Sequence, residues 1–142
     1  MDQSHSIERF AKHQESDYAT ARAEIRSGRK RSHWMWYIFP QLRGLGASFT
    51  SRYYGIEDLE EAEAYLLHPV FGPRLCEITQ AALDLPESDA YRIFGSPDHM
   101  KFHSCMTLFS QVSEEDLFNR ALEKFFGGLE DQKTLKLLEK RK

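Results

Sequence analysis

Apolar residues recur along most of the chain at spacings of three and four, which is the pattern of helices with one buried face. Between residues 17 and 27, for example, Tyr18, Ala21 and Ile25 fall on one side of a helix. Glycine and proline stand between such segments, so they mark the ends of elements. The pattern predicts eight helices over residues 6–14, 17–27, 58–67, 73–85, 89–94, 97–112, 114–126 and 131–139, with short helical segments at 33–39 and 48–54.

Residues at the ends of these segments support the predicted boundaries. Asp58 followed by Glu61 forms a start that resembles a capping box, and the proline after His68 disfavours a helical conformation at that residue. Gly28 suits the C-terminal cap of the helix before it. Fifteen leucines and fourteen glutamates against two valines also favour helices over strands. The predicted fold is therefore all-α, a single domain over residues 1–142 built as an irregular bundle of about eight short and medium helices.

Composition excludes several classes of protein. With 142 residues, of which 41% are hydrophobic and 29% charged, the chain can bury a core and is not disordered. Its longest apolar run, Trp34–Phe39, is far shorter than a membrane span, and Met1–Ser6 is too polar to begin a signal peptide. Cys76 and Cys105 are too few for a disulfide scaffold. We therefore expect a reduced, cytoplasmic protein without a membrane partner.

The net charge of −3 conceals an uneven distribution along the chain. No acidic residue occurs between Ile25 and Ile56, and this acid-free window contains six basic residues. They are Arg26, Arg29, Lys30, Arg31, Arg43 and Arg52. The rest of the chain therefore carries −9, and an acidic run begins at Glu57. A pI of about 6.1 argues against a dedicated nucleic-acid-binding protein. The window favours a small anionic ligand, and the alternative is helix capping and ion pairs with the acidic run.

Basic and aromatic residues meet in the middle of this window. Arg29, Lys30 and Arg31 directly precede Trp34 and Trp36. Two tryptophans two residues apart on a short helix point to different sides, so we expect one of them to form the wall of a cleft. There it would stack on a planar base while the basic side chains hold a phosphate. The alternative is ordinary aromatic packing in the core.

The neighbouring residues extend this candidate site. His33 is a candidate acid or base because imidazole titrates near neutral pH, and the alternative is an imidazole that only bonds to the backbone. The stretch Gly44–Ser48 resembles a phosphate-binding turn, although it lacks the lysine of a Walker loop, and a plain turn is the alternative. We therefore add Gln41, Arg43 and Ser48 to the expected ligand-binding residues.

A second group of candidates lies on the predicted helix 97–112. Asp98, Lys101 and Ser104 share one face, and an Asp–Lys pair beside a serine could activate a nucleophile or position a substrate hydroxyl. An ordinary surface ion pair is the alternative. His99 and His103 are four residues apart, but nothing supplies further ligands at the spacing of a metal site. We therefore expect neither a metal nor another cofactor.

Several segments are too unusual to be generic core sequence. They are Gly28–Gln41, Tyr65–Leu75, Ile93–Asp98 and Lys101–Phe109. In these segments the chain resembles the bacterial family called domain of unknown function 1810, also described as mycobacterial-hypothetical-protein-like. The likeness extends from about Phe10 to about Leu138 and implies an all-α single domain without an established activity. The chain departs from the family pattern at His99, where a second acid is usual, and at Cys105, where a second serine is usual.

Two functions follow from these residues. In the first, the protein is a small enzyme or sensor that binds a phosphate-bearing, nucleotide-like molecule, and a hydrolase or transferase step would use His33 or Asp98 for proton transfer. In the second, it is a non-enzymatic module whose exposed aromatic residues dock another protein while the basic segment sets the orientation. The sequence does not predict an oligomeric state.

Overall fold

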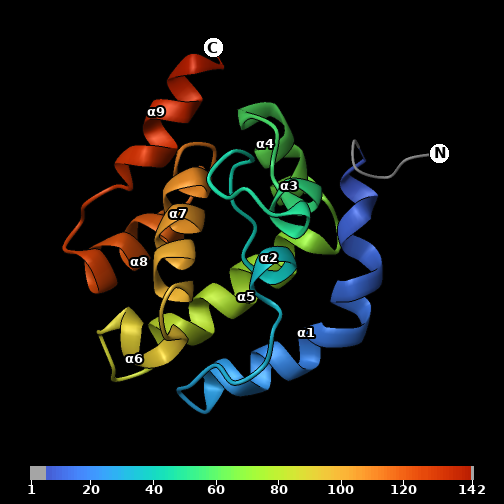
Figure 1. Cartoon of the computed structure of the whole chain (residues 1–142). Coiled ribbons are helices and arrows are strands. Elements are labelled where there is room, and N and C mark those ends of the chain that lie inside the picture. Colours follow the sequence, from blue (N-terminus) through green and yellow to red (C-terminus); the bar gives the residue numbers. More distant parts are fainter. Residues whose placement is uncertain (1–5, 142) are drawn as a thin grey trace.

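The computed structural model describes residues 6–141, and most of this range is helical (Figure 1). In chain order the elements are the 3-10 helix η2 (Ile7–Phe10) and the α-helices α1 (Ala11–Arg26), α2 (Met35–Ile38), α3 (Phe49–Tyr54), α4 (Leu59–Leu67), α5 (Phe71–Leu83), α6 (Ala90–Phe94), α7 (Asp98–Ser110), α8 (Leu117–Phe126) and α9 (Gln132–Lys140). Within the described range no strand forms, and one isolated parallel bridge joins Leu42 to Ile56. The predicted all-α bundle is confirmed.

The starts of several helices follow the expected capping chemistry. The side chains of Ser48, Asp58 and Asp131 each accept a hydrogen bond from the backbone N–H three residues later. Each therefore satisfies one of the donors that the first turn of a helix leaves unpaired. At the other end of α4, the helix stops at Leu67 and His68 is extended, as the following proline predicts.

The N-terminal region differs from the prediction. The sequence predicts helices over 6–14 and 17–27, whereas a single α-helix, α1, runs through the expected break. The hydroxyl of Ser16 lies 3.1 Å from the carboxylate of Asp17 and 3.2 Å from the carbonyl of His13, so this pair does not cap a new helix. Gln14 and Tyr18, one turn apart, are both buried, which shows that the inward face continues across the polar residues between them.

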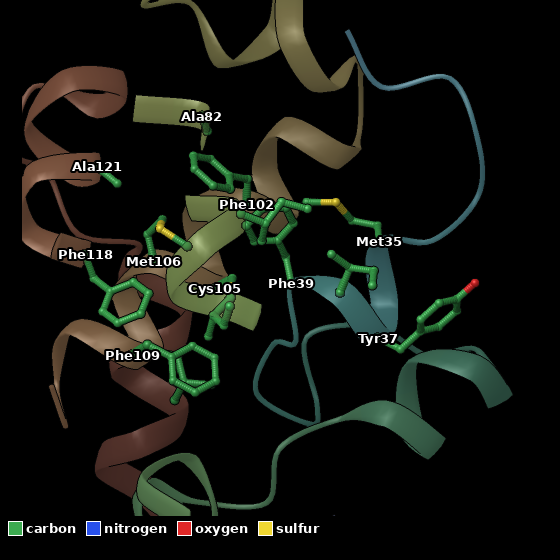
Figure 2. Packing of buried hydrophobic residues seen from close by; sticks show 14 of the residues in the cluster. Met35, Tyr37, Phe39, Ala82, Phe102, Cys105, Met106, Phe109, Phe118 and Ala121 are labelled. Carbon is green, nitrogen blue, oxygen red and sulfur yellow. The ribbon is translucent and has the colours of Figure 1, made fainter. Parts of the chain in front are cut away.

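Helix α7 lies at the centre of the core. Phe102, Met106 and Phe109 of this helix are fully buried, and Figure 2 shows them between Phe39 on one side and Phe118 of α8 on the other. The ring of Phe102 meets the ring of Phe39 edge to face, with centroids 5.2 Å apart. Burial of each such side chain stabilises the fold by roughly 1.5–3 kcal/mol. The core therefore fixes α7 firmly, and the residues on its other face acquire defined positions.

The two cysteines are free thiols, Cys105 in the core and Cys76 half-buried on α5. Burial raises the pKa of both thiols, and the charge of Glu115 raises that of Cys76 further. Neither is therefore an activated nucleophile.

In the described part of the chain no helix combines the length and the apolar character that crossing a membrane requires.

Candidate functional site

A cavity of about 390 Å³ lies where the α2–α3 connection, the first half of α7 and the start of α9 meet. This volume falls at the lower end of the range for small-molecule sites. The lining residues are Trp36, Gln41, Leu45, Gly46, Ala47, Ser48, Pro97, Met100, Lys101, His103, Ser104, Asp131 and Lys133. We call this cavity the α7 pocket. Five of its residues were candidates from the sequence, namely Trp36, Gln41, Ser48, Lys101 and Ser104.

The two tryptophans take different positions, as their spacing predicts. Trp36 lines the α7 pocket, and a Cβ atom added at Gly46 would lie 3.3 Å from its ring. Trp34 is only 1% exposed, and its indole N–H donates to the carboxylate of Glu24 at 2.9 Å. Trp34 is therefore a core residue with a satisfied polar atom, and the sequence-based suggestion that it stacks on a ligand does not fit this position. Trp36 alone remains as the aromatic wall.

The carboxylate of Glu24, just before the acid-free window, organises the basic segment that follows. It accepts hydrogen bonds from the backbone N–H groups of Arg31 and Ser32 at 2.7 and 2.9 Å, from the Ser32 hydroxyl and from the indole of Trp34. Burial on its own would raise the pKa of this carboxyl group, but the four hydrogen bonds lower the pKa of Glu24 to about 2. The connection between α1 and α2 is therefore held by an anion of the protein itself.

Three charged residues join this connection to the α7 pocket. The ammonium of Lys30 lies 2.7 Å from one carboxylate oxygen of Asp98, and the ammonium of Lys101 lies 3.2 Å from the other. Lys101 also lies over the ring of Trp36, with its nitrogen 4.1 Å from the centroid. The predicted pair of Asp98 and Lys101 therefore forms. Because two ammonium groups share one carboxylate, the cluster keeps a positive charge, and Lys101 presents it to the pocket.

Gln41, one of the residues that line the pocket, carries an unused hydrogen-bond donor. The residue is 5% exposed, its backbone carbonyl accepts from the N–H of Ile56 at 2.8 Å, and its side-chain Nε2 has no partner in the described structure. An unsatisfied buried donor costs about 1–3 kcal/mol. Such groups are few in native proteins, and each calls for an explanation such as a bound water, an ion or a functional role.

Ser104 lies on the pocket side of α7 but has the partners of a structural residue. Its hydroxyl lies 3.1 Å from the carbonyl of Met100 and 3.0 Å from a carboxylate oxygen of Asp131. That carboxylate oxygen also accepts from the N–H and hydroxyl of Thr134, as the N-cap of α9. Because a hydroxyl has one proton to donate, these contacts occupy the donor of Ser104. The contact with Asp131 joins α7 to the start of α9, so Ser104 helps to hold α9 against α7.

His103 supplies an imidazole to the same wall. Its Nε2 lies 2.7 Å from the carbonyl of Leu129, and its ring stacks on Phe126 with centroids 3.9 Å apart. A carbonyl only accepts, so Nε2 carries the proton in this bond.

His99 is engaged separately through its Nδ1, 3.2 Å from the carbonyl of Gly95. Over residues 6–141 no group of three or more His, Cys, Asp or Glu side chains is placed to hold a metal ion.

The arginines of the acid-free window do not line this pocket. Arg43 forms an ion pair with Glu57 at 2.5 Å, and it lines a separate, mainly acidic cavity beside α4. For Arg43 the structure therefore matches the alternative of pairing with the acidic run. Arg29 and Arg31 are exposed on the α1–α2 connection, and so is His33, whose carbonyl accepts from the hydroxyl of Tyr37. Long-range packing, which local sequence does not reveal, separates these residues from Trp36.

Sequence reasoning missed the residues that α9 and the segment before it contribute. Asp131 and Lys133 line the pocket because α9 packs against α7. The start of a helix at Asp131 was predicted, but no local pattern indicates which helix it meets. Met100, which is 54% exposed and lines the pocket, also escaped notice. The available signal was a methionine directly before Lys101 and off the helical stripe of Phe102, Met106 and Phe109.

Comparisons with known proteins agree with the all-α fold. A family model described as protein of unknown function (DUF1810) matches residues 4–138. A solved structure, that of the conserved hypothetical protein Rv1873 from Mycobacterium tuberculosis, is 46% identical, with a TM-score of 0.90. The alignment covers 93% of this chain and 95% of that one. No curated protein matches the chain.

Proposed function

The chain belongs to the DUF1810 family of proteins of unknown function, and we propose that its α7 pocket binds a small phosphate-bearing, nucleotide-like molecule. The observation that carries the proposal is the shared carboxylate of Asp98. Lys30 takes the shorter of its two contacts, so Lys101 shares the single carboxylate with which it forms an ion pair in the described structure. Lys133 adds another cation to the lining, and the two lysines together favour a phosphate group.

The other walls suit a planar ring. Trp36 offers an aromatic face, and Met100 adds a flexible apolar side chain beside it. The ammonium of Lys101 lies over that face, in the place that a stacked base would take. We expect the ring of the ligand to displace the ammonium, which then contacts the phosphate. The unpaired Nε2 of Gln41 would donate to an acceptor on the ligand.

Binding is the core of the proposal, and a hydrolase or transferase step would be added to it. Such a step would have to use residues of the pocket, Lys101 and Ser104, because His33 lies outside it. The Ser104 hydroxyl would first have to leave its contacts with Met100 and Asp131. These contacts make binding the better supported part of the function.

Thermal shift and tryptophan fluorescence test the proposal together. We would titrate the protein with nucleoside monophosphates, ADP-ribose and inorganic phosphate. A ligand that binds only the folded state raises Tm, and one that stacks on Trp36 also quenches fluorescence, a change that Trp36→Phe removes. Lys101→Gln should weaken binding at least about tenfold, which is about 1.4 kcal/mol.

Lys136→Gln is the matched control, because Lys136 is an exposed lysine of α9 that does not line the pocket. The proposal fails if no compound of the panel raises Tm. It also fails if Lys101→Gln and Lys136→Gln weaken binding equally, since the effect would then reflect net charge and not the pocket.

A further inference from the structure

A second cavity, of about 380 Å³, lies between α4, α5 and the connection from α7 to α8. Its floor is apolar and includes Leu66, Val112 and Phe118, with the thiol-bearing Cys76 beside them. Leu67, which lies at its edge and is the last residue of α4, is 76% exposed. We call this cavity the α4–α5 groove, and nothing in the proposed function uses it.

The rim of the groove is acidic and lacks ionic partners. Glu63, Glu114 and Glu115 line it together with the apolar residues, and no lysine or arginine is among its lining residues. In the described part of the chain none of these three carboxylates takes part in an ion pair, whereas the neighbouring Asp116 is paired with Arg120 at 3.2 Å. Like charges gathered around an apolar floor repel one another unless something positive offsets them.

We propose that the α4–α5 groove docks a segment of a partner protein in which lysine or arginine residues flank a leucine-sized apolar side chain. The apolar anchor would fill the floor beside Phe118, and the flanking cations would meet Glu63, Glu114 and Glu115 at the rim. An apolar centre with a charged rim is the usual arrangement of a protein interface. Charge complementarity selects a basic partner over an acidic one, and a polyanion such as RNA would be repelled.

The chain contains a reporter for this site. Cys76 lines the groove and is half-buried, while Cys105, the only other cysteine, is fully buried. A bound segment would shield Cys76 from a thiol reagent and leave the slow reaction of Cys105 unchanged. Because the pKa of Cys76 is raised, the labelling rate is best measured at alkaline pH.

The probe is a fluorescein-labelled peptide with leucines flanked by lysines, compared with the same peptide carrying glutamate in place of lysine. We expect the lysine peptide to bind, to slow the labelling of Cys76 at least about tenfold and to lose affinity as salt rises, because the attraction is partly ionic. The combined variant Glu114→Gln and Glu115→Gln should weaken binding about tenfold, the equivalent of about 1.4 kcal/mol.

Leu67→Ser tests the apolar part and should also weaken binding. Its matched control is Leu129→Ser, because Leu129 is similarly exposed, at 71%, and lies in the α8–α9 connection outside the groove. Both substitutions are on the surface, so both proteins should fold. The proposal is overturned if the lysine peptide leaves the labelling of Cys76 unchanged, or if Leu129→Ser weakens binding as much as Leu67→Ser. Either result is independent of ligand binding at the α7 pocket.

Discussion

Two lysine–tryptophan pairs share the carboxylate of Asp98, and their surroundings differ. The ammonium of Lys30 lies 5.0 Å from the ring centroid of Trp34, and that of Lys101 lies 4.1 Å from the ring centroid of Trp36. The side chain of Lys30 is 7% exposed and Trp34 is buried beneath it, whereas the side chain of Lys101 is 22% exposed and borders a cavity. The same two residue types are therefore structural in one place and available to a ligand in the other.

The two pairs differ in how many of the polar and charged groups around each tryptophan have a partner. Around Trp34, the indole N–H and the backbone N–H groups of Arg31 and Ser32 all bond to Glu24. Around Trp36, the neighbouring Gln41 keeps an unpaired donor and Lys101 keeps unbalanced charge. Residue type alone therefore does not identify a binding site, and the bonding capacity that the fold leaves unused is the better guide.

The largest effect should come from removing each tryptophan in turn. Trp34→Ala leaves a cavity in the core and should lower the free energy of unfolding by about 3–5 kcal/mol. Trp36→Ala removes a side chain that already borders a cavity and should cost less than about 1.5 kcal/mol, because its loss leaves little new void. Urea denaturation measures both. Equal losses would mean that the two pairs do not differ as described.

The carboxylate of Glu24 should give a smaller effect that depends on pH. Because its pKa is depressed to about 2 in the folded protein, its stabilisation is fully present above the ordinary pKa of about 4.5 and is lost as the pH falls toward 2. Glu24→Gln should therefore lower stability at pH 7 by about 2 kcal/mol, the worth of charge-assisted hydrogen bonds. It should also flatten the decline of stability between those pH values. A slope identical to that of the parent would contradict the hydrogen-bonded arrangement.

The two lysines should separate stability from binding. Lys30→Gln removes a buried partner of Asp98 and should cost about 1–2 kcal/mol in the free energy of unfolding, since Asp98 keeps its contact with Lys101. Lys101→Gln should cost less than about 1 kcal/mol, the value typical of a partly exposed pair. Thermal unfolding of both variants without ligand measures this difference. The comparison is wrong if Lys101→Gln is the more damaging change.

The smallest effect should come from Gln41→Leu. Replacing an unpaired buried amide by an apolar group of similar size removes a cost and should leave stability unchanged or raise it by up to about 1 kcal/mol. The same change should weaken binding of a nucleoside monophosphate, because the donor is lost. Calorimetric unfolding without ligand and thermal shift with it provide the two readouts. A clear loss of stability would show that the Gln41 side chain is satisfied in the folded protein.

Local sequence predicted the parts of the site that lie within one element. Asp98, Lys101 and Ser104 share a face because their spacing matches a helix, and the two tryptophans diverge because theirs does not. The same reasoning located the helix ends at Asp58 and His68 and the break before α9. Together these rules are enough for the all-α fold and for one wall of the pocket.

Such local rules do not predict contacts between segments that are distant in the sequence. The ion pair of Arg43 with Glu57 depends on how α3 returns the chain beside the α2–α3 connection, and the bond from Ser104 to Asp131 spans 27 residues. A charge count shows that arginines are close in sequence, but it does not show which acid each will meet. Tertiary packing decides that, and it pairs Arg43 with an acid away from the α7 pocket.

The contribution of α9 to the pocket has a consequence for how the site arises on the ribosome. Asp131 and Lys133 are translated after the residues of α1 to α8, whose side chains form most of the core. Chains emerge from the N-terminal end at roughly 5–20 residues per second, so the core residues are available before those of α9. A nascent chain that has not yet released α9 from the exit tunnel therefore holds Trp36 and Lys101 but lacks the wall that Asp131 and Lys133 provide. Ligand binding by stalled chains of increasing length would then begin only when α9 emerges.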